Sequence, residues 1–162
     1  MKFDSTVPIT KQIGYDTGNT FHKFNEIGLQ KAYDSPNNIY IEDDNMFIAG
    51  TKTWGDVFQD WIKLPLGSTN RTQRYQDADK ALQRNPQVHN LVGHSLGASV
   101  ALELEKRHPE LYVQAAYGTP TVSTSRTNNR FKHPNDPVAV FDNSAITKSN
   151  KQGYNQHTFK NY

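Results

Sequence analysis

The chain has 162 residues and a mass of 18.4 kDa, which suits one domain and leaves no room for a second core. Apolar residues make up 35% and charged residues 21%, but eight Phe, eight Tyr and two Trp can anchor a core, which argues against full disorder. Lys and Arg number 18 against 16 Asp and Glu, without a long basic run, so nucleic acid is not the expected partner. The lack of cysteine excludes disulfides, thiolate metal sites and a cysteine nucleophile.

The sequence shows no targeting or membrane-spanning segment. No stretch approaches the roughly 18 consecutive apolar residues of a membrane span. The first eight residues contain an acid and no apolar run, so we do not expect a secretory signal there. Localisation is therefore left open.

The first pattern in chain order is a β-hairpin. Residues 38–42 and 46–49 are rich in β-branched and aromatic side chains, and the turn cluster Asp43-Asp44-Asn45 separates them. Gly50 and Thr51 follow where the second strand is expected to end. Residues 1–37 match no pattern and stay unassigned.

A short helix capped by Thr53 is expected next. Trp54, Val57, Phe58 and Trp61 recur at helical spacing and form an apolar stripe. Two interpretations of this stripe stay open. It is either a lid helix that docks on a lipid surface, with Trp54 and Phe58 binding substrate, or part of the core, which is the commoner role.

The remaining elements alternate between helix and strand. The patterns predict helices over residues 72–84 and 98–108 and strands over residues 88–92, 111–117 and 130–133. An apolar segment covers 138–141, and a tail with Tyr154, Phe159 and Tyr162 is expected to dock on the body. Because parallel strands need helical crossovers, the order predicts an α/β fold with a mostly parallel central sheet flanked by helices.

The pattern Gly93-x-Ser95-x-Gly97 fits a nucleophile elbow, in which a serine projects from a sharp turn between strand and helix. Glycine on both sides lets the neighbouring backbone pass closely. The alternative is a glycine-rich turn with a capping serine. The apolar strand before the pattern and the helix of small residues after it favour the elbow.

A serine nucleophile needs a base and an acid. On this architecture the chain order is serine, acid, histidine, and only His157 follows both Ser95 and the later aspartates. Asp136 precedes a proline that restricts its backbone, so it is the favoured acid, and Asp142 is the fallback. The alternatives are a plain turn aspartate for Asp136 and an exposed tail histidine for His157.

Acyl transfer also requires hydrogen-bond donors for the developing oxyanion. The N–H of Leu96 follows the nucleophile. Thr51 offers an N–H and a hydroxyl from the loop after an earlier strand, although an ordinary strand end is an equally good interpretation of Gly50-Thr51.

Four blocks together carry a family resemblance: residues 47–51 with the Trp and Asp residues that follow, 92–98, 117–122 and 135–138. On these blocks, the chain resembles the class 3 lipases, the fungal-lipase-like branch of the α/β-hydrolases. The resemblance implies that Ser95 is the nucleophile, Asp136 the acid, and Thr51 and Leu96 the oxyanion donors. The chain departs from the family at Ala49, where an arginine is usual, and in the position of the histidine near the chain end.

The sequence therefore predicts one α/β-hydrolase domain over residues 1–162 that hydrolyses lipid esters as a lipase or phospholipase A. A lipid or ester substrate, and a membrane or lipid surface, are the expected partners. No metal and no organic cofactor is expected. Two alternatives stay open: a non-catalytic lipid-binding or interaction protein on the same scaffold, and an acyltransferase or thioesterase. The oligomeric state is not predicted.

Overall fold

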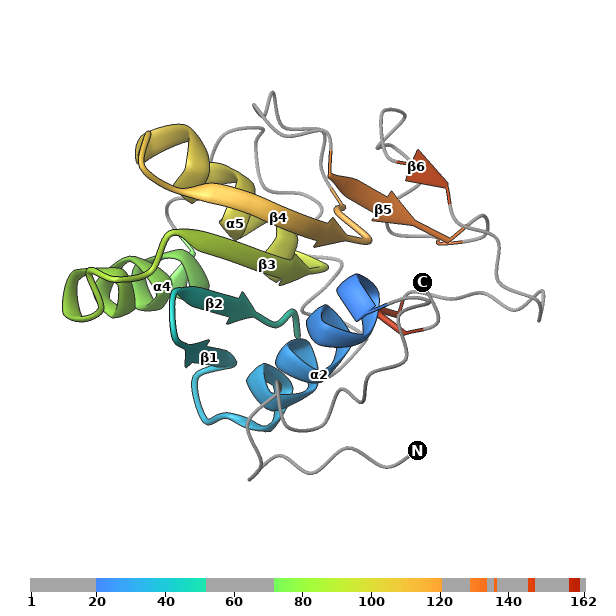
Figure 1. Cartoon of the computed structure of the whole chain (residues 1–162), viewed down its shortest axis with the longest axis horizontal. Coiled ribbons are helices and arrows are strands. Elements are labelled where there is room, and N and C mark those ends of the chain that lie inside the picture. The colour runs from blue at the N-terminus through green and yellow to red at the C-terminus, as the bar shows by residue number, and fades with distance from the viewer. Residues whose placement is uncertain are drawn as a thin grey trace.

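One six-stranded sheet organises the molecule, in the order β1-β2-β3-β4-β5-β6 (Figure 1). The computed structural model describes residues 20–51, 72–120, 129–133, 136, 146–147 and 158–160. The strands are β1 (Ile39–Glu42), β2 (Asn45–Ile48), β3 (Asn90–His94), β4 (Tyr112–Tyr117), β5 (Arg130–Lys132) and β6 (Ile146–Thr147). Among the described strands, only β1 and β2 pair antiparallel. The predicted α/β fold with a mostly parallel sheet is confirmed.

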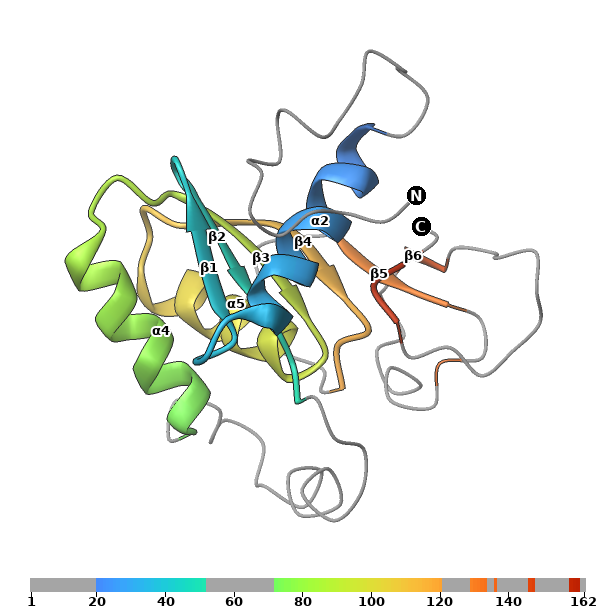
Figure 2. The ribbon, with the colours of Figure 1, turned by 90° about the horizontal axis from the view of Figure 1, so that it is seen from below.

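Helices cover both faces of this sheet. Helix α2 (Thr20–Asp34) lies on one face, and helices α4 (Gln73–Arg84) and α5 (Leu96–Arg107) lie on the other (Figure 2). Side chains of β2 alternate between the two sides, as a pleated strand requires. Met46 and Ile48 join the core cluster with α4 and α5, whereas Phe47 joins the cluster with α2. The result is a three-layer arrangement with two cores.

Local chemistry explains the two best-predicted elements. The hairpin turns at Asp43, whose φ of 55° is in the left-handed region that Asp tolerates better than most residues. Helix α4 begins within one residue of its predicted start, because the Thr72 side chain caps it by accepting the Tyr75 N–H at 3.2 Å. The helix ends at Arg84, and its C-cap Asn85 precedes Pro86.

Helix α2 falls within the segment that the sequence left unassigned. Gly28 lets this helix approach the sheet closely, because a Cβ at this position would overlap the Phe47 ring of β2. On the same helix, the buried Asn25 donates through Nδ2 to the Tyr117 hydroxyl of β4 at 2.9 Å. One residue without a side chain and one buried amide thus fix how α2 crosses the sheet.

Several boundaries differ from the sequence-based expectation. Strand β3 begins at Asn90 instead of residue 88, and α5 begins at Leu96, directly after the serine. Strand β6 was not predicted, since two residues carry no periodicity. The expected helix after Thr53 and the apolar segment 138–141 lie outside the described residues. Among the helices that the structure describes, none has the length and apolarity to cross a bilayer.

Candidate active site

Ser95 occupies the turn between β3 and α5 with a backbone that favours glycine. Its φ is 57° and its ψ is −124°, a conformation that costs a side-chain-bearing residue about 1–3 kcal/mol. The Ser95 N–H donates to the Tyr117 carbonyl of β4 at 2.9 Å, which ties the turn to the sheet. The serine side chain makes no capping hydrogen bond to α5. This differs from the alternative interpretation of the pattern, in which Ser95 would cap the helix.

The two glycines of the pattern are required by close contacts. A Cβ on Gly97 would overlap the Ile48 carbonyl at the end of β2, and a Cβ on Gly93 would overlap Gly97 and the Ala98 backbone. The first turn of α5 is therefore packed directly onto the end of β2. This packing holds Ser95 at the carboxyl edge of the sheet, where ligands of open α/β sheets usually bind.

The loop after β2 lies against the serine. Ile48 pairs with Gly93 in the sheet register, and a Cβ built on Gly50 would be 2.8 Å from the Ser95 Cβ. Thr51 comes next along the chain and is half-buried. Of the two predicted oxyanion residues, Leu96 directly follows Ser95, and Thr51 directly follows Gly50, the loop residue that lies against Ser95. As the first residue of α5, Leu96 has an N–H with no acceptor inside its helix.

Among the acids after Ser95, the structure separates Asp136 from the glutamates of α5. Glu103 pairs with Arg107 at 2.7 Å, and the buried Glu105 accepts the Val113 N–H at 2.7 Å. Asp136 follows β5 at the same sheet edge as Ser95, with β4 between the two strands. It is 4% exposed, and its N–H donates to the His133 carbonyl at 3.1 Å.

His157 lies outside the described residues, but the chain just after it packs at the elbow. Phe159 is 8% exposed and stacks on Tyr33, with ring centroids 5.3 Å apart. It also meets the His94 ring edge-on at 5.2 Å. The Lys160 carbonyl lies 3.0 Å from His133 Nε2. The predicted docking of the tail is confirmed for Phe159.

Tyr33 and His94 are site residues that the sequence analysis missed. The Tyr33 hydroxyl lies 2.6 Å from His94 Nδ1 and accepts the Gly50 N–H at 3.1 Å. Burial raises the pKa of Tyr33 to about 12, against a smaller opposing effect of the Gly50 hydrogen bond, so the phenol stays protonated near neutral pH. The only sequence signal was the position of His94 inside the elbow pattern, because Tyr33 is 61 residues away.

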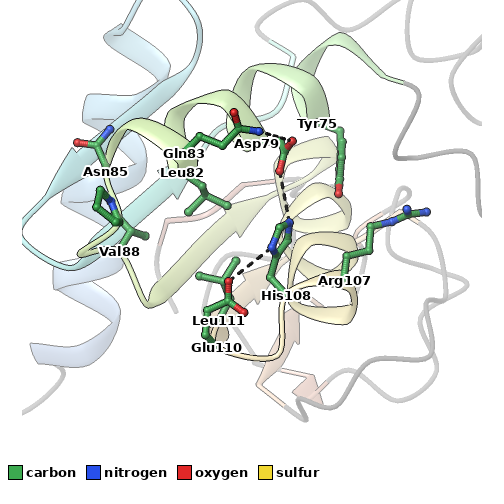
Figure 3. Close-up of a pocket in the computed structure, with 11 residues that line it drawn as sticks. Tyr75, Asp79, Leu82, Gln83, Asn85, Val88, Arg107, His108, Glu110 and Leu111 are labelled. Atoms are coloured by element: carbon green, nitrogen blue, oxygen red, sulfur yellow. Dashed lines mark hydrogen bonds and ion pairs between the residues drawn. The ribbon is translucent and has the colours of Figure 1, made fainter.

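Two cavities lined by described residues lie at opposite ends of the parallel strands. The first, of about 370 Å³, opens beside the elbow and is lined by Thr51, His94, Phe159 and Lys160 among others. The second, of about 530 Å³, lies at the amino ends of β3 and β4, where α4 and α5 end (Figure 3). There, His108 lies between Asp79 at 3.3 Å and Glu110 at 3.5 Å. The smaller cavity is lined by His94, the residue before the strained serine, and by Thr51, so we assign the candidate site to it.

Three of the sequence-based expectations concern residues that the structure does not describe. Trp54 and Phe58, the predicted substrate contacts, and Asp142, the fallback acid, lie outside the described ranges.

Within the described ranges, no group of three or more His, Asp or Glu side chains is arranged to hold a metal ion.

The part of the chain that contains the serine turn also matches a known family. The Esterase family model, whose description reads "Putative esterase", matches residues 73–159, more than half of the chain. The chain belongs to the Esterase family. No curated protein and no solved structure matched it.

The range of the Esterase match divides the candidate site. It includes Ser95, Leu96, Asp136 and His157, whereas Thr51 and α2 precede it. The match identifies an esterase-like α/β-hydrolase, in agreement with the fold, and does not single out the class 3 lipases.

Proposed function

We propose that this member of the Esterase family is a serine carboxylic-ester hydrolase of the class 3 lipase type, acting on lipid esters as a lipase or phospholipase A. One observation carries the proposal: Ser95 is held in a strained conformation at the strand-to-helix turn, inside the family match, with its hydroxyl unused as a helix cap. Strained backbone that tight packing enforces is concentrated at functional sites.

The proposed mechanism assigns one role to each predicted residue. Ser95 Oγ attacks the acyl carbonyl while His157 takes the hydroxyl proton, and Asp136 orients the imidazole. His157 then gives the proton to the leaving alcohol, and the acyl group remains on Ser95. Water, deprotonated by His157, attacks this acyl-enzyme; the bond to Ser95 Oγ then breaks, His157 returns the proton to Ser95 Oγ, and the carboxylic acid leaves.

Charge stabilisation is the second requirement of this mechanism. The N–H of Leu96 and the N–H and hydroxyl of Thr51 are the proposed donors to the oxyanion. Such donors act without reorganisation when the loops that carry them are already fixed. The close approach of Gly50 to Ser95, which leaves no room for a Cβ on Gly50, supports this assignment because Thr51 is the next residue.

The proposal of a lipid substrate rests on the resemblance to class 3 lipases and on the apolar stripe that contains Trp54 and Phe58. In the proposal these two side chains contact the acyl chain or the lipid surface. Replacing both by alanine should lower hydrolysis of long-chain esters more than that of short-chain esters.

The test of the proposed function is Ser95→Ala. Its turnover of p-nitrophenyl butyrate should fall by about 10⁴–10⁶-fold, because triad members act as a unit. His157→Ala should cause a loss of similar size. Ser99→Ala, one helical turn further along α5, and His108→Ala, at the other end of the sheet, are the matched controls and should stay near wild type. Near-normal hydrolysis by Ser95→Ala would rule out the serine mechanism.

A fluorophosphonate probe and a substrate panel separate the remaining alternatives. Labelling that depends on Ser95 would argue against a non-catalytic binding protein. Comparing triacylglycerol, phospholipid vesicles and a thioester, each with and without an alcohol acceptor, distinguishes hydrolysis of lipids from thioesterase or acyltransferase activity.

A further inference from the structure

Helix α2 contributes to the elbow although it lies outside both the family match and the blocks that resemble class 3 lipases. It contacts β1, β2 and β3. Its second-to-last residue, Tyr33, touches the loop after β2 and the histidine that precedes Ser95. We propose that Tyr33 is a positioning residue that fixes the Gly50-Thr51 loop relative to the nucleophile turn. This inference rests on the proposed function.

The Tyr33 oxygen joins two strands that parallel pairing brings side by side. It accepts the Gly50 N–H at 3.1 Å, from the end of β2, and lies 2.6 Å from His94 Nδ1, at the end of β3. A phenol has one proton to donate and two lone pairs. The Gly50 N–H occupies one lone pair, so the contact with His94 Nδ1 uses either the phenol proton or the second lone pair, according to the imidazole tautomer.

This bond has a direct consequence for catalysis. Because the Gly50 N–H is directed to Tyr33, it is not available to a substrate oxygen, and the donors on this loop reduce to the N–H and hydroxyl of Thr51. Losing the Tyr33 hydroxyl would leave the Gly50 N–H without its acceptor. The peptide would then turn to find another acceptor, because an unpaired buried N–H is costly. That rotation would displace Thr51.

Two further side chains hold the same loop from other elements. Asn38 donates through Nδ2 to the Gly50 carbonyl at 3.1 Å, and Arg74 of α4 donates through Nη1 to the Ala49 carbonyl at 3.0 Å. Three side chains therefore fix two consecutive residues. Tyr33 differs from the other two because it also contacts His94, so it sets the separation between the loop and the elbow.

The Tyr33 ring has a separate packing role. It stacks on Phe159 with an interplanar angle of 13° and a centroid distance of 5.3 Å. Tyr33→Phe removes the hydroxyl and keeps this ring, so it tests the hydrogen bonds alone. Tyr40→Phe is the matched control, because the Tyr40 hydroxyl bonds Glu42 on β1 at 2.7 Å, away from the elbow.

The experiment measures kcat and KM for p-nitrophenyl butyrate, per active site titrated with a fluorophosphonate, so that unfolded molecules do not count. Tyr33→Phe should lower kcat by about 10-fold to 100-fold, less than the roughly 10²–10³-fold loss for deleting an oxyanion donor outright. KM should stay within twofold, because the oxyanion forms only in the transition state. Tyr40→Phe should change neither constant. An unchanged kcat, or a loss confined to KM, would overturn the proposal.

A double-mutant cycle with Thr51→Val tests whether Tyr33 acts through Thr51. If it does, the combined loss in kcat should be clearly smaller than the product of the single losses. Fully multiplicative losses would overturn the proposal. Failure of the proposed function looks different, since hydrolysis would then survive Ser95→Ala.

Discussion

At both the carboxyl and the amino edge of the sheet, a histidine lies beside a cavity. The two edges differ in the backbone conformation next to the histidine and in how deeply the histidine is buried. At the carboxyl edge, His94 is 4% exposed and the next residue has a left-handed φ. At the amino edge, His108 is 34% exposed, and its carboxylate partners are on ordinary surface elements. The larger cavity is at the amino edge, so cavity size alone does not identify a functional site. Enforced strain and buried polar contacts are better indicators.

The largest expected effect contrasts the aspartates of the two edges. Asp136→Asn should lower kcat for p-nitrophenyl butyrate by about 10³–10⁴-fold, because an amide does not hold the imidazole in the working tautomer. Asp79→Asn, beside His108, should leave kcat unchanged. Steady-state kinetics of both variants and of Asp142→Asn measure the contrast. A larger loss in Asp142→Asn than in Asp136→Asn would transfer the acid role to Asp142.

A smaller effect concerns stability. Gly97→Ala would drive a Cβ into the Ile48 carbonyl and should lower the free energy of unfolding by about 3 kcal/mol, the upper range for overpacking. His108→Ala removes only half-exposed ion pairs and should cost less than about 1 kcal/mol. Urea denaturation gives both values. Equal losses would mean that the two edges are equally tightly packed.

The smallest effect separates strain from function. Ser95→Gly should raise the free energy of unfolding by about 1 kcal/mol, because glycine relieves the cost of the positive φ, while activity is lost. Asp43→Gly, at the hairpin turn with φ 55°, should also gain stability but retain activity. Urea midpoints and kcat test the pair. A less stable Ser95→Gly variant would show that the elbow is not strained.

The sequence predicted the elements whose signals are local. The hairpin follows from its turn residues, α4 from its apolar periodicity, and the β3–α5 turn from the glycines around Ser95. Helix α2 was missed because its buried face includes Asn25, Gly28 and Lys31, which interrupt the apolar periodicity. Those residues are explained by partners far along the chain, such as Phe47 for Gly28.

The same distinction applies to the site. Ser95 could be selected because its turn needs a particular pattern of adjacent residues. Tyr33 could not, because its role depends on a contact with His94 across 61 residues and on the register of β2 with β3. The assignments of Asp136, His157 and Thr51 stay predictions that rest on chain order and resemblance.

The position of the antiparallel strand β1 also has a consequence for aggregation. Among the described strands, β1 is at one end of the sheet, so one side of its backbone is a template for another chain. The strand is four residues long, and Glu42, Asp43 and Asp44 follow one another at its end. A second copy that added its own β1 there in antiparallel fashion would find little length to pair and would bring more carboxylates close by. We therefore expect this edge to resist aggregation by strand addition.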